Sequence, residues 1–467
     1  MNPIRAGAGI ALFLSLTVGA VSSEPETVTI RGEAFQVWPV EDLNARGFDI
    51  PPAVKEDNAA WAYIDAINAY EEVPPALRDA LQYAAMTAWP GEIDGFTEYL
   101  DQPKNRRAIR LAVDGTRLKQ CRMPYFGDPK TSVIGVLLPH LSSMRHLSKL
   151  MTADGRRLES EGKDDEAIER YLAVMRMGQH VNSDFTLIEG LVGMAVWTLG
   201  QRALVEMVLR EPLTVKQLRM IQGKLTEFGK RLPTVNKGLW GERTFGPAIV
   251  DEVCSRPLLF FSQLRGLDPA SDSFGFSSEP LNANPADGWG ELEFRIGRLI
   301  YPDRAIKRHM LEYYDKVLEE AEKGPREAKT LDAERYIAEE IPKWDVIPRV
   351  VLPSLSRAIE LGERLKAEAA MARAVVAIRL YSIEHDGRPP PDLTVLAERL
   401  PEGVFFDPFG GRDLVYRSAD ESWIVYSVGP NLVDDGGQQG EQWDEFDRVR
   451  RFPPEPVEPF EREGGGS

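Results

Sequence analysis

Oxygen-bearing side chains gather in the segment 429–437, which reads GPNLVDDGG. Asn431, Asp434 and Asp435 offer amide and carboxylate oxygens within a few residues, and the two glycines that follow let the backbone curl so that carbonyl oxygens can join them. Calcium in proteins takes about six to eight such oxygens. The segment therefore predicts either a structural calcium site or a solvated acidic turn in which the side chains cap neighbouring backbone amides.

The other residues that could do chemistry form no familiar catalytic motif. The chain has no HExxH, GxSxG, Walker or dinucleotide-binding pattern. His140 and His146 are six residues apart, about 240° around a helix, so they would not share a face for a metal ion. Asp251 and Glu252 lie beside Cys254 among apolar residues, but adjacent acids do not converge on one face. The sequence thus favours a non-catalytic protein.

Two elements must position the acidic segment: a long helix over 354–385 and a β-hairpin over 413–428. One face of the helix is smooth enough for a sheet to lie close to it, because it carries Ala369, Ala370, Ala374, Ala377 and Ile378. Gly387 ends this helix. Alternation predicts one buried face for the hairpin, formed by Leu414, Tyr416, Trp423, Val425 and Ser427, with Ala419-Asp420 at the reversal. A sheet this small needs the apolar surface of the helix for stability.

Residues 356–437 carry an alanine-faced helix, a glycine-proline exit, a DPFGG turn and the YSVGPN…DDGG loop, in that order. In this order of motifs the segment resembles the soluble domain of the major pseudopilin of type II secretion systems. The resemblance implies a helix packed on a small antiparallel sheet. It also implies a calcium ion bound by the loop through Asn431, Asp434 and Asp435.

The resemblance has limits. Asp444 and Asp447 are further oxygen donors that could complete the calcium site, but they lie further along the chain. About 350 residues precede the module, and Arg379 and Glu384 interrupt its helix, so membership of a filament is not implied. The helical remainder resembles a group of exported bacterial proteins that carry the same terminal module, and this likeness implies no activity.

Helical spacing dominates the chain before the module. A strand-like piece falls within residues 24–55, and a helix follows with Asp57 as its expected cap. Further helices are expected over 303–323 and 325–341, after a long loop over 266–304 that is rich in Ser, Pro, Asp, Asn and Gly.

Two segments in the middle of the chain have the clearest packing signals. The stretch around Gly162 predicts a helical hairpin, in which Gly155 lets Tyr171 fill the groove between the helices. Only one such unit is present, which favours a hairpin within a bundle over a repeat array. Residues 184–210 are apolar on nearly all sides, which predicts a buried central helix.

Charge and the first residues indicate a compartment. The formal net charge of −17 argues against binding to nucleic acid or to an anionic membrane surface. Arg5 and the apolar run that follows it predict a signal peptide over residues 1–23. We expect no later segment long and apolar enough to span a bilayer. Cys121 and Cys254 are the only cysteines, and they could form one disulfide or remain two buried thiols.

The predicted fold class is mainly α with a small C-terminal α+β domain: a helical bundle or hairpin array followed by a pseudopilin-like helix plus antiparallel sheet. The expected regions are the signal peptide (1–23), a mainly helical domain (24–345), a pseudopilin-like α+β domain (346–452) and an acidic flexible tail (453–467). We expect an exported, periplasmic or cell-envelope-associated binding or scaffold protein with a protein partner. The alternatives are an envelope hydrolase with a carboxylate-based site and an accessory component of a type II secretion-like system.

Overall fold

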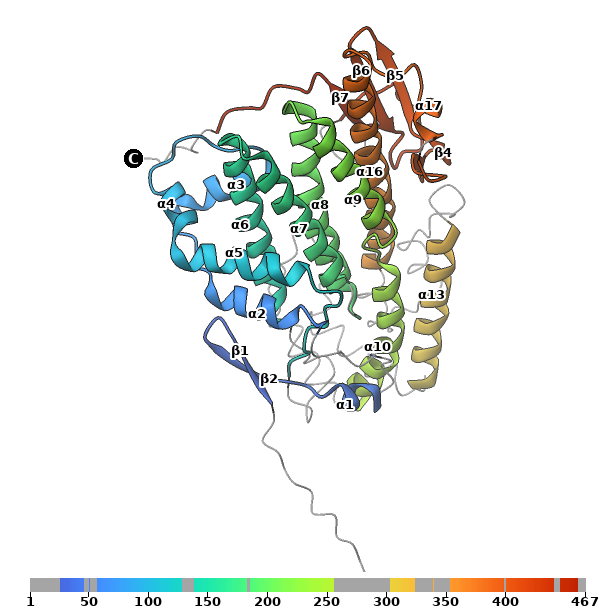
Figure 1. The fold of residues 1–467 in the computed structure, drawn as a ribbon. Coiled ribbons are helices and arrows are strands. Elements are labelled where there is room, and N and C mark those ends of the chain that lie inside the picture. Colours follow the sequence, from blue (N-terminus) through green and yellow to red (C-terminus); the bar gives the residue numbers. More distant parts are fainter. Residues whose placement is uncertain are drawn as a thin grey trace, which may run out of the picture.

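A computed structural model describes residues 26–45, 50, 57–127, 138–182, 185–255, 303–323, 339, 353–398, 400–440 and 446–460. It confirms the predicted fold class, since a mainly helical body carries small antiparallel sheets near the C-terminus (Figure 1). The expected signal peptide lies outside the described residues. Most of the expected loop over 266–304 and of the expected helix over 325–341 lies outside them as well.

The elements follow one another along the chain in this order: β1 (Thr27–Ile30), β2 (Glu33–Gln36), α1 (Val40–Ala45), α2 (Ala60–Ala69), a short 3-10 helix (Pro75–Leu77), α3 (Arg78–Met86), α4 (Phe96–Asp101), α5 (Pro103–Thr116), α6 (His140–Ser160), α7 (Asp164–Val181), α8 (Leu187–Arg210), α9 (Val215–Gly229), α10 (Asn236–Ser255), α13 (Asp303–Lys323), α16 (Pro353–Glu384), α17 (Thr394–Ala397), β3 (Phe406–Asp407), β4 (Arg412–Asp413), β5 (Val415–Ala419), β6 (Ser422–Ser427) and β7 (Arg448–Phe452).

Helices α6 and α7 form the predicted hairpin. Gly162 turns the chain between them with a φ of +70°. The Tyr171 ring is fully buried against Gly155, and a Cβ atom on that glycine would lie 2.5 Å from Cε1 of the ring. The close approach expected from the sequence is therefore confirmed.

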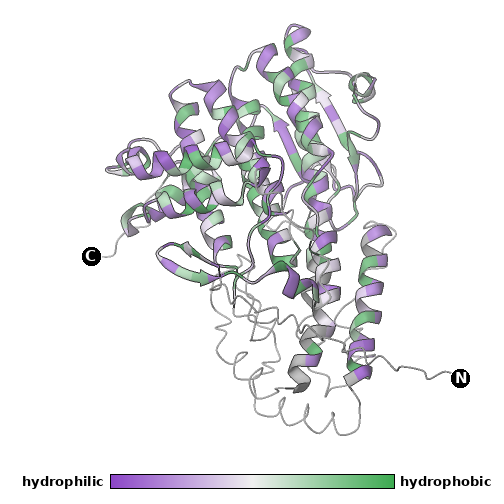
Figure 2. Ribbon diagram, turned by 60° about the horizontal axis from the view of Figure 1, so that its bottom comes forward, coloured by the Kyte–Doolittle hydropathy of each residue, from purple (hydrophilic) through white to green (hydrophobic). Residues whose placement is uncertain are grey.

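Helix α8 is the central helix of the body. It packs against α6, α7, α10 and α16, so apolar residues are buried around most of its circumference. Thr186 caps its first turn in a reciprocal capping box with Glu189. The helices of the body carry both hydrophobic and hydrophilic residues, as amphipathic helices do (Figure 2). The prediction of a buried central helix over 184–210 is confirmed for α8.

Helix α16 joins the body to the C-terminal sheets. It packs against α8 and α9, and it also packs against β3 and β6. The main sheet has the order β5-β6-β7, with all neighbours antiparallel. Trp423 and Val425 of β6 share one buried cluster with Ala370 and Ala374 of α16. The hairpin and the alanine-lined helix are thus in direct contact, as the sequence predicts.

Two local predictions near the N-terminus have different outcomes. The strand-like piece contains β1 and β2, so its strand character is confirmed, and it folds as a hairpin because Arg31 and Gly32 both adopt positive φ. Asp57 does not cap α2, because the helix begins after Ala59. The side-chain oxygen of Asn58 accepts the Ala60 N–H at 3.1 Å instead.

The C-terminal segment contributes more than the sequence suggests. Residues 448–452 form β7, the third strand of the sheet, paired with β6 in a register that places Arg450 opposite Val425. The segment after β7 crosses to the side of α3 (Figure 1). There the Tyr83 hydroxyl donates to the Glu458 carbonyl, and the Phe460 ring packs edge-on against Tyr83. Of the tail expected over 453–467, the part up to residue 460 therefore has defined contacts with the body.

Candidate functional site

The acidic loop brings its predicted residues together. The Asn431 amide donates to the Asp435 carboxylate at 2.8 Å. One Asp434 oxygen accepts the Tyr426 hydroxyl at 2.9 Å, while its other oxygen lies 3.4 Å from the Arg412 guanidinium. The side chains therefore hold one another and the adjoining strands in place.

Asp447 closes this loop from the far side. Its buried carboxylate accepts the N–H groups of Asp435 and Gly437, at 3.3 and 2.7 Å. Burial raises the pKa of Asp447, and these two hydrogen bonds oppose the rise. The loop thus has the all-oxygen donor types that calcium takes, but several of those oxygens accept protein hydrogen bonds. Within the described residues, no group of three or more acidic, histidine or cysteine side chains has the arrangement of a metal site. Calcium stays a prediction here.

The other residues considered for chemistry lie apart. Asp251 is exposed and forms an ion pair with Lys307. The side chains of Glu252 and Cys254 lie outside the described residues, so the choice between a disulfide and two buried thiols is not tested, although Cys121 is buried. Among the histidines, His180 shares a hydrogen bond of 2.8 Å with a buried tyrosine hydroxyl. The ring of His385 stacks on a neighbouring tyrosine ring.

Two acids that the sequence did not single out lie near the start of α8, the buried Glu189 and the half-buried Glu242. Glu189 accepts the N–H and hydroxyl of Thr186, and Glu242 of α10 accepts the Leu187 N–H at 3.3 Å. Burial raises the pKa of both carboxyls, and that of Glu242 reaches about 7. The buried ring of His140 lies 3.9 Å from Glu189. These acids satisfy N–H groups that α8 cannot pair internally, which gives them a structural role.

One stripe of α8 is not covered by the rest of the described chain. Its members are exposed or half-exposed, and they are Ile188, Leu191, Ala195, Thr198 and Arg202. Helices α3 and α6 lie on one side of this α8 stripe and α16 on the other (Figure 1). The result is a groove of about 560 Å³ with the stripe as its floor, which we call the α8 groove.

The walls of the α8 groove are apolar with a cationic rim. Arg145 and Lys149 stand one turn apart on α6, Arg364 stands on α16, and Arg202 ends the floor. Glu368 is the one acidic residue in the lining. Burial, and then the charge of Arg145, lower the pKa of Lys149. Lys149 makes no ion pair with a carboxylate among the described residues. The groove is therefore electropositive in a chain whose net charge is −17.

Glu368 is already engaged by other residues. Its carboxylate lies 2.6 Å from Arg450 and 3.6 Å from Arg448, both on β7. Although its burial opposes ionisation, these guanidinium groups and Arg364 hold its pKa below the ordinary value. Three guanidinium groups, those of Arg364, Arg448 and Arg450, therefore act on this one carboxylate.

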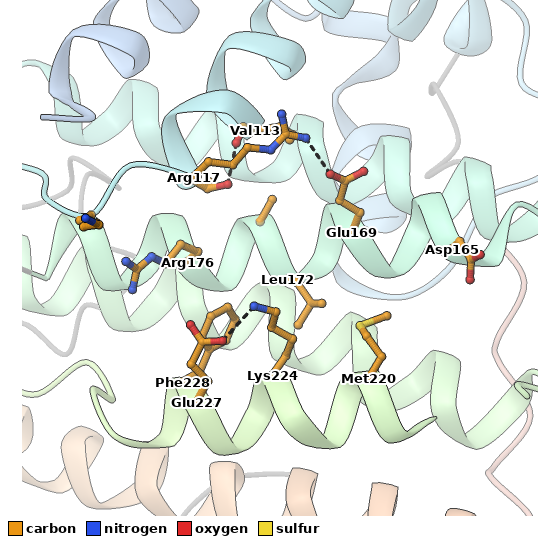
Figure 3. Close-up of a pocket in the computed structure, with 13 residues that line it drawn as sticks. Val113, Arg117, Asp165, Glu169, Leu172, Arg176, Met220, Lys224, Glu227 and Phe228 are labelled. Carbon is orange, nitrogen blue, oxygen red and sulfur yellow. Dashed lines mark hydrogen bonds and ion pairs between the residues drawn. The ribbon is translucent and has the colours of Figure 1, made fainter. Parts of the chain in front are cut away.

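A second hollow, between α5, α7 and α9, differs in its charge balance (Figure 3). This α7 cleft has a volume of about 660 Å³. Arg117 pairs with Glu169 at 3.0 Å, and Lys224 pairs with Glu227 at 2.8 Å. Its third acid, Asp165, accepts a hydrogen bond from a glutamine side chain on α9. Its acids are thus matched from within the chain. In the rim of the α8 groove Arg202 pairs with Glu206 at 3.0 Å, whereas Lys149 makes no such pair among the described residues.

Helix α8 corrects one expectation about membranes. By length and composition it could cross a bilayer, contrary to our expectation for the segments after the signal peptide. In the structure 67% of its most apolar window is buried, as in the core helix of a folded domain.

No protein-family model matches the chain, and no curated protein or solved structure is significantly similar to it. The pseudopilin resemblance therefore stays a prediction.

Proposed function

We propose that this protein is a non-catalytic binding component of the bacterial cell envelope, and that it holds a protein partner in the α8 groove. The observation that carries the proposal is the α8 stripe, which the described residues leave uncovered on a helix that is mostly buried. Exposed contiguous apolar surface rimmed by polar groups marks interaction sites in soluble proteins. The stripe runs from Ile188 to Arg202, on the order of 20 Å along the helix, which suits a segment of another chain.

Export is part of this proposal and has its own test. The apolar run after Arg5 supports cleavage near residue 23. We expect the mature protein, recovered from the envelope fraction of the cells that produce it, to begin close to Glu24. Recovery from the cytosol with residues 1–23 still attached would contradict export.

Site-specific photocrosslinking tests the groove. A benzophenone amino acid at Gln82, an exposed residue of α3 in the groove lining, places a reactive group beside the floor without filling it. The same residue at Gly223, an exposed position on α9, provides the control. We expect a discrete covalent adduct in cells from position 82 only, and its loss when Leu191→Asp is added. Absence of an adduct at 82, or its persistence with Leu191→Asp, would overturn the groove as the binding surface. Identification of the adduct as a secretion-apparatus protein would support the accessory secretion role.

An envelope hydrolase is the second candidate, favoured by the raised pKa values of Glu189 and Glu242 and by His140, which lies 3.9 Å from Glu189. None of these three residues lines the α8 groove or the α7 cleft. A panel of ester, peptide and glycoside substrates tests this candidate. Hydrolysis that disappears in a folded Glu242→Gln variant would favour the enzyme over the binding protein.

A further inference from the structure

The spacing of the α8 stripe specifies the shape of a partner. Its five residues, from Ile188 to Arg202, follow one another at alternating steps of three and four. This is the a/d spacing with which one helix packs lengthwise against another. The small side chains of Ala195 and Thr198 occupy the middle of the stripe, so a second helix can approach closely there.

The rim specifies the charge of that partner. Cations stand on both sides of the stripe, with Arg145 and Lys149 on one wall and Arg364 on the other. They are also spread along its length, since Arg145 and Lys149 are one helical turn apart and Arg202 lies at the far end. The half-buried Lys149 has no carboxylate partner among the described residues, so an incoming acid would supply it with a counter-charge.

From this geometry we propose that the occupant of the α8 groove is an amphipathic helix of a partner protein, with an apolar seam against the α8 stripe and acidic residues on both flanks. The inference rests on the proposed function and defines its partner. Acids flanking an a/d seam would face the two cationic walls at once. A lipid has a single headgroup, so it would match only one point of a rim whose charges are spread along the groove.

The test uses the full mature chain and fluorescent synthetic peptides of about three heptads. The probe peptide has Leu at a and d and Glu at e and g. One control peptide has the same composition with the leucines redistributed around the helix, and the other has Lys in place of each Glu. In fluorescence anisotropy we expect saturable binding of the probe, and binding weaker by at least about tenfold for both controls. Raising the salt from about 50 to 500 mM should also weaken binding of the probe.

Variants of the chain assign the binding to the groove. Ala195→Trp fills the floor of the groove, and Arg145→Glu with Lys149→Glu reverses the charge of one wall. Each change should weaken binding of the probe peptide by about tenfold or more. The matched control is Arg107→Glu with Arg110→Glu, which reverses two exposed cations on α5 outside the groove and should leave binding unchanged. Circular dichroism and a thermal melt establish that each variant is folded.

Several outcomes would overturn the inference. Equal binding of the probe and the redistributed peptide, no binding of the probe, or full binding by the Ala195→Trp variant would each do so. Cosedimentation with phosphatidylglycerol vesicles that is lost in Ala195→Trp would assign the groove to lipid instead. A crosslinked protein adduct at position 82 without selectivity for acidic helices would leave the proposed function standing and remove only this description of the partner.

Discussion

The carboxylate of Glu368 on α16 receives a hydrogen bond from the guanidinium of Arg450 on β7 at 2.6 Å, which ties the last strand of the sheet to the central helices. Removing the acid from this buried pair leaves Arg448 and Arg450 without a counter-charge. We therefore expect Glu368→Gln to lower the free energy of unfolding by about 3 kcal/mol, measured by urea titration. The matched change Glu384→Gln, on the same helix in a more exposed pair with Arg219, should cost about 1 kcal/mol or less.

The effect of Glu368→Gln should depend on pH in a known direction. The pKa of Glu368 in the folded protein lies below its ordinary value of 4.5. Its contribution to stability is therefore complete above that pH and disappears as the pH falls through the lower folded value. The difference between the two proteins should shrink in acid, and a constant difference down to about pH 3 would contradict this assignment.

The Tyr171 ring leaves no room for a β-carbon at Gly155. The added methyl group would meet the Tyr171 ring at 2.5 Å, so Gly155→Ala should destabilise the protein by about 1–3 kcal/mol. Gly223→Ala is the control, because a Cβ atom there meets open space on α9 and should stabilise by roughly 0.5–1 kcal/mol. Thermal melts compare the melting temperatures of the two variants with that of the natural protein. An unchanged melting temperature for Gly155→Ala would show that α6 and α7 can move apart without loss of stability, against the prediction.

Glu242 should make the protein less stable as the pH rises. Burial raises its folded-state pKa to about 7, above an ordinary value of 4.5, so the folded protein holds a proton that the unfolded chain has released. Stability should fall between these two pH values. Glu242→Gln stays neutral and keeps an oxygen for the Leu187 N–H, so it should be more stable than the natural protein at pH 8 by up to about 3 kcal/mol, and equally stable near pH 4. Exposed Glu98→Gln is the control, and identical pH profiles for Glu242→Gln and the natural protein would disprove the prediction.

Calcium at the acidic loop has a simple thermodynamic test. A ligand that binds only the folded state raises the melting temperature, so millimolar calcium should raise Tm relative to a chelator. Asp435→Asn should reduce this rise, while magnesium should reproduce little of it. A melting temperature that is the same with calcium and with chelator would leave the loop as a hydrogen-bonded acidic turn.

The features that the sequence predicted are those encoded locally. The apolar composition of α8 and the Gly155–Tyr171 approach were readable from a few neighbouring residues. Helix α10 was missed because Gly238, Gly241 and Pro247 suggest an irregular segment. In the structure two of them serve packing, since a Cβ atom on Gly238 or Gly241 would collide with the backbone just before or at the start of α8.

The α8 groove could not be found in the same way. Its cations come from α6, α8 and α16, whose order along the chain says nothing about their meeting at one rim. The arginines of β7 make that strand look polar and exposed, whereas one of their partners is a buried acid on α16. Only the spacing of the α8 stripe was present in the sequence, and there it is hidden within a helix that is apolar on nearly all sides.

The contact between Tyr83 and Glu458 joins positions 375 residues apart, and it has a consequence for the order of events during synthesis. The surface of α3 around Tyr83 can be covered in this way only after residues 458–460 have been synthesised. Until then β6 also lacks its partner β7, so the sheet consists of the β5–β6 hairpin alone.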